Sequence, residues 1–138
     1  MIGNSVFDVL ILSNWKLAPR KVSQWMTSVP TCQDLSTMIK NRLKPIIFLI
    51  NNDGYTIERV IVDRPYNDIQ PWRYHKLVEV FGGSMGLDVH TEGELEEALD
   101  KAATADCLVF IEVHARRMDC PEALLSAGRS IAKANHLD

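Results

Sequence analysis

The chain has 138 residues, a length that suits one domain, and 46% of them are hydrophobic, which is enough for a core and gives no sign of disorder. Its net charge of −3 provides no basic excess of the kind that attracts nucleic acid. No apolar run approaches the roughly 18 residues of a membrane span. We therefore expect a globular domain with no nucleic acid and no membrane among its partners.

The amino-terminal stretch and the cysteines favour a cytoplasmic location. MIGNSVFDVLILSNWK is apolar but has no basic flank and no small-residue cleavage pattern, so it is not expected to be a signal peptide. Cys32, Cys107 and Cys120 are too scattered for a disulfide framework or a close-spaced zinc motif. Small thiols in the core or on the surface are expected, in a reducing compartment.

Three short apolar runs predict strands, at Val6–Leu12, Pro45–Ile50 and Leu108–Val113. Each run is continuous and does not alternate with polar residues. Strands that are buried on both faces have this pattern, and they belong to parallel sheets covered by helices.

Segments with helical periodicity lie between and after these strands. Their apolar faces are Leu35, Met38, Ile39 and Leu43; Tyr74, Leu77, Val78 and Phe81; Leu95, Ala98, Leu99 and Ala102; and Leu124, Ala127 and Ile131. Thr91 and Glu94 have the spacing of a capping box, and Asp119 is expected to cap the last helix, from about residue 121 to 134. The glycines of FGGSMG are expected to end a helix.

The alternation of strands and helices predicts an α/β fold, a three-layer α/β/α arrangement around a mostly parallel sheet. Three strands make a small sheet, so we expect an incomplete domain or one that needs a partner surface.

The segment NNDG directly follows the strand at Pro45–Ile50. Ligands of open α/β sheets bind beyond the carboxyl ends of the strands. Amide and carbonyl oxygens suit Mg²⁺, and the carboxyl of Glu58 follows closely enough to act as an acid or base. A plain strand-to-loop turn is the alternative, because Asn and Gly both tolerate tight turns.

The segments LSTMIKNRLKPIIFLINNDGYTIE, YNDIQPWRY and VFGG closely resemble thiamine-diphosphate-dependent 2-keto acid decarboxylases, in their C-terminal part. Pyruvate decarboxylase and indolepyruvate decarboxylase are the most similar kinds. The resemblance begins near Thr31, runs to about Val113 and has a weaker tail. Residues 31–138 are thus expected to be a partial C-terminal thiamine-diphosphate-binding domain, while residues 1–30 do not resemble the family.

The resemblance implies a role for each residue of the turn. The side-chain oxygen of Asn52 and the backbone carbonyl of Gly54 would be ligands of a Mg²⁺ ion that bridges the cofactor's phosphates. Asp53 stands at a variable position of the family and is assigned no role. In this family the cofactor lies at a subunit interface of a homodimer or homotetramer.

The helix-side residues of the motif are expected to touch the cofactor. By resemblance, Tyr55, Thr56 and Ile57 pack around the diphosphate and the reactive carbon. Glu58 would handle protons on the covalent intermediates. The thiamine ring itself carries the electron chemistry of decarboxylation.

One part of the family's metal site is absent from the sequence. The family has a Gly-Asp-Gly motif upstream of the paired asparagines, and its matching positions are Gln24, Trp25 and Met26. Trp25 replaces the aspartate. Asp8 and Asp34 are the nearest acids, and neither is predicted to be a ligand. Without the carboxylate the affinity for Mg²⁺ should fall, unless residues 1–30 reflect truncation, mis-splicing or an erroneous gene model.

Two hypotheses about function follow. By resemblance, the chain belongs to an enzyme that decarboxylates a pyruvate-like 2-keto acid to an aldehyde and CO₂. The alternative is a non-catalytic remnant or docking module of such an enzyme, inactive on its own. A generic nucleotide-binding α/β domain is disfavoured because the chain has no phosphate-loop motif.

The four histidines, His75, His90, His114 and His136, are too dispersed to pair by sequence, so separate, non-catalytic side chains are expected.

Overall fold

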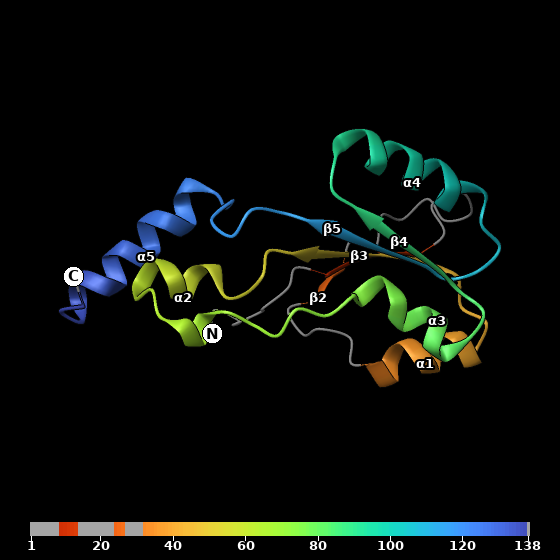
Figure 1. The fold of residues 1–138 in the computed structure, drawn as a ribbon, viewed down its shortest axis with the longest axis horizontal. Helices are drawn as coiled ribbons and strands as arrows, with labels where there is room; N and C mark the ends of the chain where they lie inside the picture. The colour runs from red at the N-terminus through yellow and green to blue at the C-terminus, as the bar shows by residue number, and fades with distance from the viewer. Residues whose placement is uncertain (1–8, 14–23, 27–31, 138) are drawn as a thin grey trace. The chain divides into compact units, whose positions relative to one another are not determined.

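The computed structural model describes residues 9–13, 24–26 and 32–137 (Figure 1). The chain divides into two compact units. The sheet unit comprises Met1–Ile50 and Arg73–His114, and the turn unit comprises Asn51–Trp72 and Ala115–Asp138. Among the described residues, every helix is too short or too polar to cross a bilayer. Most of the amino-terminal stretch, which is not expected to be a signal peptide, lies outside the described residues, as does Asp8.

The sheet unit contains a five-stranded sheet with the order β2-β1-β3-β5-β4. The strands are β1 (Val9–Ser13), β2 (Gln24–Met26), β3 (Pro45–Asn51), β4 (Met85–Val89) and β5 (Val109–His114). The arrows of β3, β5 and β4 point the same way in Figure 1, and β4 pairs with β5 in parallel. These three strands form the parallel part of the sheet, and β3 and β5 are two of the three predicted strands.

The first strand differs from the prediction. β1 is antiparallel to both β2 and β3, with Leu10 paired to Trp25 on one side and to Phe48 on the other. It was expected among parallel strands, and residues 6–8 of the predicted range lie outside the described part of the chain. An apolar run indicates a buried strand but carries no information on strand direction, so the sequence pattern was insufficient here.

Helices cover both faces of the sheet, which confirms the three-layer α/β/α prediction. Helix α4 (Glu92–Thr104) packs on one face, where Ala98 and Ala102 meet Val89, Val109 and Ile111. Helices α1 (Cys32–Lys40) and α3 (Leu77–Phe81) contact each other and lie on the other side in Figure 1. A 3₁₀ turn, η2 (Tyr74–Lys76), precedes α3 and contacts β4 and β5.

Local signals placed the helix ends of the sheet unit correctly. Thr91 accepts a hydrogen bond from the Glu94 backbone, and the Glu94 carboxylate accepts one from the Thr91 backbone, which is the predicted capping box. Helix α3 ends at Gly82 with φ 76°, a conformation that suits glycine. Asp34 lies in the first turn of α1, as expected for an acid at a helix start.

The strand β4 was not predicted. Its sequence MGLDV is interrupted by Gly86 and Asp88, so it lacks a continuous apolar run. Gly86 is required by packing, because a Cβ atom there would lie 1.9 Å from the backbone oxygen of His75. The position of this strand therefore depends on its packing against the His75 backbone and its pairing with β5, which the sequence of the strand itself does not reveal.

The turn unit contains α2 (Thr56–Ile61), the 3₁₀ turn η1 (Pro65–Asn67) and α5 (Glu122–Ala134), and α2 packs on α5. Two predictions for α5 were wrong. The residue that precedes its first turn is Pro121 rather than Asp119. The buried positions are Gly128 and Ala132, while Ala127 and Ile131 are exposed.

The buried positions of α5 are small residues because α2 lies very close to them. A Cβ atom on Gly128 would lie 2.5 Å from Cγ1 of Val60. The helices pack through a glycine, so the largest apolar side chains do not mark the buried face.

Candidate functional site

The segment Asn51–Gly54 forms a tight turn at the carboxyl end of β3. Asp53 and Gly54 both have positive φ, 60° and 149°. A Cβ atom on Gly54 would lie 2.1 Å from the backbone oxygen of Asn67, so only glycine fits. The side chain of Asn51 closes the turn, because its Oδ1 accepts a hydrogen bond from the Asp53 backbone at 3.2 Å.

A buried arginine that the sequence analysis did not single out holds the turn in place. Arg59, 7% exposed, donates from Nη2 to the backbone oxygen of Asp53 at 2.6 Å and from Nη1 to that of Asn52 at 3.4 Å. Its Nη2 also contacts Oδ1 of Asp68 at 2.8 Å. One guanidinium group thus organises two successive carbonyls of the turn.

Asp68 completes this arrangement from η1. The hydrogen bond from Arg59 holds the pKa of Asp68 below its ordinary value, helped by the charge of Arg117 and opposed by a partial loss of solvation. Arg117 donates to the same carboxylate oxygen at 3.1 Å. Gly54 lies in a β-bridge with Asp68, which brings η1 alongside the turn.

The side chain of Asn52 is oriented by a short chain of hydrogen bonds. Its Nδ2 donates to Oγ1 of Thr56 at 2.7 Å, and Thr56 in turn donates to the backbone oxygen of Arg117 at 2.9 Å. Within the described residues, the Oδ1 atom of Asn52 is buried and has no hydrogen-bond partner. A buried amide oxygen without a donor is suited to a cation ligand.

The remaining predicted residues surround the first turn of α2. The backbone N–H of Tyr55 donates to the Asn67 oxygen at 2.9 Å. Thr56 is buried, and the Cδ1 atom of Ile57 would lie 3.3 Å from a Cβ atom on Gly128, so this side chain faces α5. Glu58 is partly buried in the same turn, and no hydrogen bond or ion pair joins its carboxylate to another described residue.

The structure thus brings Asn52, Gly54 and the first turn of α2 into one region of the turn unit. Apart from Glu58, the described acids beside the turn face arginines: Oδ2 of Asp53 lies 4.0 Å from Nε of Arg117, and Asp68 is bonded to Arg59. The backbone of Trp25, the residue at the position of the family's aspartate, lies in β2, and its side chain lies outside the described part of the structure.

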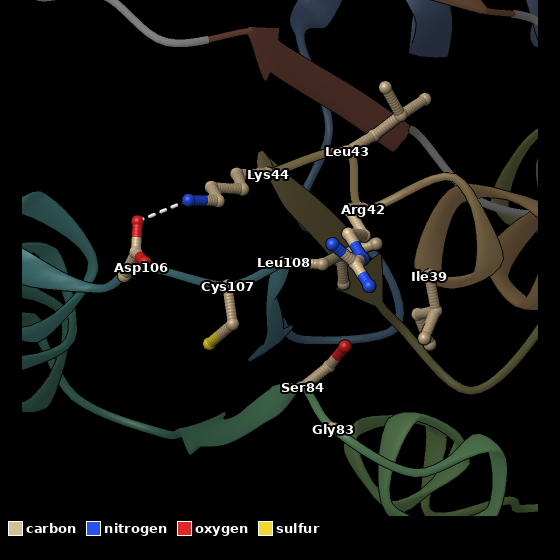
Figure 2. A pocket seen from close by; sticks show the side chains of 9 residues that line it. All are labelled: Ile39, Arg42, Leu43, Lys44, Gly83, Ser84, Asp106, Cys107 and Leu108. Atoms are coloured by element: carbon tan, nitrogen blue, oxygen red, sulfur yellow. Dashed lines mark hydrogen bonds and ion pairs between the residues drawn. The ribbon is translucent and has the colours of Figure 1, made fainter.

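A separate hollow lies in the sheet unit and contains none of the predicted site residues. Its volume is about 360 Å³. Lys44 and Asp106, which both line the hollow, form an ion pair that Figure 2 shows as a dashed line. Ser84, at the start of β4, and Cys107, just before β5, line the same space. No residue of the NNDGYTIE motif lines this hollow, so the motif gives no reason to expect substrate or cofactor there.

The α/β fold with a polar turn at a strand's carboxyl end defines a ligand-binding class of domain, and comparison with known proteins identifies the family. Residues 27–113 match the family described as thiamine pyrophosphate enzyme, C-terminal TPP binding domain. The chain belongs to this family, which confirms the resemblance seen in the sequence.

Several pyruvate decarboxylases are similar to this chain. Pyruvate decarboxylase 1 of Arabidopsis thaliana and pyruvate decarboxylase 2 of Nicotiana tabacum are each 47% identical over 111 residues, which cover 76% of this chain and 18% of the relative. Pyruvate decarboxylase of Aspergillus terreus is 45% identical over 112 residues, covering 76% and 20%. The chain thus spans about a fifth of the length of these relatives.

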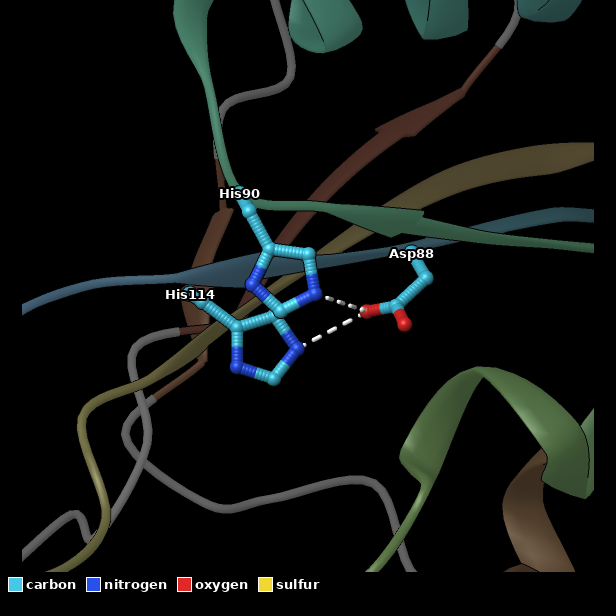
Figure 3. A group of neighbouring side chains, drawn as sticks. All are labelled: Asp88, His90 and His114. Carbon is cyan, nitrogen blue, oxygen red and sulfur yellow. Dashed lines mark hydrogen bonds and ion pairs between the residues drawn. The ribbon is translucent and has the colours of Figure 1, made fainter.

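Sequence reasoning missed a second polar group of side chains. His75, His90 and His114 were expected to be separate, but all three lie within 4 Å of Asp88 in the sheet unit, and Figure 3 shows His90 and His114 beside it. His75 and His114 also lie within 4 Å of Glu112. The sequence contained a signal: Asp88-Val89-His90 and Glu112-Val113-His114 repeat the order acid, valine, histidine at the ends of two strands.

Proposed function

We propose that this chain binds the diphosphate of thiamine diphosphate through Mg²⁺, as the C-terminal part of a 2-keto acid decarboxylase. The observation that supports the proposal is the buried, unpartnered Oδ1 atom of Asn52, oriented by Thr56. The family match supports thiamine diphosphate as the cofactor, and the decarboxylase relatives support a pyruvate-like substrate.

The residues of the turn fit a hard cation. Asn52 would supply its side-chain oxygen and Gly54 its backbone carbonyl, two ligands of the type that Mg²⁺ prefers. Both are neutral, so the negative charge at the ion would come from the phosphates. Arg59 keeps the Asn52 and Asp53 carbonyls turned toward itself, which leaves the Asn52 side chain free to face the ion.

Glu58 is the proposed proton-handling residue. No described residue forms a hydrogen bond or ion pair with its carboxylate, which leaves this group available to a ligand. Tyr55, Thr56 and Ile57 are proposed to line the diphosphate, and the Thr56 hydroxyl acts through Asn52. Thiamine diphosphate, when bound, supplies the electron sink for loss of CO₂.

The non-catalytic alternative rests on a specific observation. The residues at the Gly-Asp-Gly position are Gln24, Trp25 and Met26, and the described acids beside the turn, Asp53 and Asp68, both face arginines. With Glu58 assigned to proton transfer, no unpaired carboxylate of the described residues is left for the metal, and such a site would bind Mg²⁺ weakly. The chain would then be a docking module that binds cofactor only with a partner subunit, since the family's site lies at an interface.

Calorimetric titration of the purified chain with thiamine diphosphate in excess Mg²⁺ tests the proposal. Saturable binding is expected, which Asn52→Ala should abolish and Glu58→Gln should preserve. Asn41→Ala is the matched control, because Asn41 is an exposed asparagine that bonds only to the backbone of its own helix. Binding that survives Asn52→Ala would refute the metal role of Asn52.

A decarboxylation assay with pyruvate then separates the two functions. Aldehyde release that is lost in Glu58→Gln while cofactor binding is retained would support an enzyme. Cofactor binding without aldehyde release would support the docking module.

A further inference from the structure

The acid-valine-histidine repeats lie on neighbouring strands in matching register. Asp88 of β4 pairs with Glu112 of β5, and Val89 pairs with Val113. Side chains alternate along a strand, so the two valines share one face and pack beneath α4. The acids and His114 therefore share the opposite face, and so does His90, which directly follows β4.

The five polar side chains on this face form a connected group. Nε2 of His114 lies 2.8 Å from Oδ1 of Asp88, and Nε2 of His90 lies 3.5 Å from the same oxygen. Nδ1 of His75 lies 2.7 Å from Oε2 of Glu112 and 3.7 Å from Asp88. Glu112, 1% exposed, also accepts from the His75 backbone at 3.0 Å.

Two parts of this group differ in burial. His75 contacts the buried Glu112 carboxylate through its backbone N–H and Nδ1, and Nε2 of His114 lies 3.8 Å from Oε1 of the same carboxylate. Asp88, His90 and His114 are more exposed, and Figure 3 shows the two imidazole rings directed at one carboxylate oxygen. Loss of solvation opposes ionisation of Asp88, but the bond from His114 and the nearby imidazoles outweigh it, so the pKa of Asp88 lies below its ordinary value.

The spacing of the three exposed groups suits a transition metal. Their ligand atoms lie within 4.8 Å of one another. Tetrahedral zinc with bonds of about 2.0–2.2 Å separates neighbouring ligand atoms by about 3.3–3.6 Å. The 3.5 Å between Nε2 of His90 and Oδ1 of Asp88 matches this separation, whereas the 2.8 Å between Nε2 of His114 and the same oxygen is a hydrogen-bond distance that must lengthen when the ion binds. Two imidazoles and one carboxylate are a ligand set that Zn²⁺ accepts, with water in the fourth position.

Binding of such an ion also requires a change in the orientation of one imidazole ring. The rings of His90 and His114 are stacked, 4.0 Å apart and inclined by 9°, so their Nε2 lone pairs run nearly parallel. The side chain of His90 is 57% exposed and has room to turn its ring toward a shared ion.

We propose that Asp88, His90 and His114 bind a divalent first-row transition metal of the Zn²⁺ type, at the carboxyl ends of β4 and β5. This site is independent of the turn after β3. Its imidazole ligands favour Zn²⁺, Co²⁺ or Cu²⁺ over Mg²⁺, whereas the turn offers only oxygen ligands.

Titration of the untagged chain with Co²⁺, followed by visible absorption, tests the site. Saturable binding with intense bands of four-coordinate cobalt is expected, unaffected by excess Mg²⁺ and displaced by Zn²⁺. Asp88→Asn, His90→Ala and His114→Ala should each weaken it at least about tenfold. His136→Asn is the control, because His136 is exposed, lies outside the group and has a positive φ that asparagine tolerates.

Further measurements distinguish the loss of a metal ligand from a loss of folding and from binding at the turn after β3. His90 is exposed, so His90→Ala should retain the far-ultraviolet circular dichroism of the native chain, and a loss of cobalt binding in this variant reports a lost ligand. Asn52→Ala should leave cobalt binding unchanged. The proposal is overturned by absence of saturable binding, by unchanged affinity in any of the three ligand variants, by loss of binding in Asn52→Ala, or by a near-ultraviolet thiolate-to-cobalt band that assigns the ion to the cysteines.

Discussion

Nδ2 of Asn52 donates a 2.7 Å hydrogen bond to Oγ1 of Thr56, and this contact fixes which end of the amide faces the buried space. The Thr56 hydrogen is already used by the Arg117 backbone oxygen, so its hydroxyl can only accept from Asn52. The amide oxygen of Asn52 therefore remains available. A hydroxyl on α2 thus orients the proposed metal ligand on the preceding turn.

Thr56→Val tests this relationship. Valine keeps the size but removes the hydroxyl, so the Asn52 amide is free to rotate and the Arg117 carbonyl loses its donor. We expect Mg²⁺-dependent cofactor affinity to fall about tenfold and the free energy of unfolding to fall by about 1–3 kcal/mol. Thr56→Ser should recover most of both in calorimetric titration and urea denaturation. A serine variant as weak as valine would assign the effect to packing.

Gly54→Ala tests the need for a glycine in the turn. The new Cβ atom would lie 2.1 Å from the Asn67 oxygen and 2.3 Å from Nη2 of Arg59. We expect a loss of more than about 2 kcal/mol in the free energy of unfolding and no measurable cofactor binding. The control is Gly93→Ala in α4, where nothing lies within 4 Å of the new Cβ atom. That variant should be neutral or stabilised by up to about 1 kcal/mol. Equal effects of the two substitutions in urea denaturation would contradict the steric explanation.

Arg59→Lys tests whether the guanidinium group organises the turn. Lysine keeps the charge but cannot reach two carbonyls and a carboxylate in one plane. We expect a loss of about 2–4 kcal/mol in the free energy of unfolding, because Arg59 is buried and its partners are left unpaired. Cofactor affinity should fall with it.

The matched control is Arg64→Lys. Arg64 is exposed, and among the described residues its side chain donates to the neighbouring Asp63 backbone alone, at 3.2 Å. The free energy of unfolding of this variant should therefore change by less than about 0.5 kcal/mol. If urea denaturation shows the two lysine variants to be equally stable, the role given to Arg59 is wrong.

Asp68 makes stability depend on pH in a defined direction. Its pKa in the folded chain is lowered from 3.8, mainly by the hydrogen bond from Arg59. The unfolded chain therefore binds more protons in this range, and folding stability rises with pH. The stabilisation is fully present above the unfolded pKa and is lost as pH falls through the folded pKa.

Asp68→Asn should therefore be less stable than the native chain at pH 7 and should approach it as pH falls below about 4. Thermal denaturation at pH 7 and at pH 3 measures the two differences. A difference that stays constant between these pH values would show that the carboxylate charge contributes nothing.

Helices and strands were predictable where the signal is local. The capping box of Thr91 and Glu94 and the helix stop at Gly82 depend on residues within a few positions of one another. The strands at Pro45–Asn51 and Val109–His114 were visible as continuous apolar runs. Strand β4 and the direction of β1 were not predictable, because both depend on pairing with distant strands.

The candidate site was predictable only in its motif. NNDGYTIE identified Asn52, Gly54 and Glu58 by resemblance, and the family match confirms the family. The residues that hold the turn in place, Arg59 and Asp68, could not be predicted, because neither belongs to a recognisable sequence pattern. Their partners are mainly backbone carbonyls and a carboxylate, whose positions depend on how η1 folds back along the turn.

The sequence alone determined the α/β class, the family and the local helix ends, because periodicity, capping residues and an eight-residue motif are properties of neighbouring positions. Only the tertiary structure decided which carbonyls Arg59 binds, which end of the Asn52 amide is free, and that His90 and His114 share one carboxylate. The shared carboxylate joins residues 26 positions apart, which the parallel register of β4 and β5 brings together. The contacts of Arg59 and Asn52 span only four to seven positions, but they depend on how the turn folds back on α2 and on the distant Arg117 carbonyl that takes the Thr56 hydrogen.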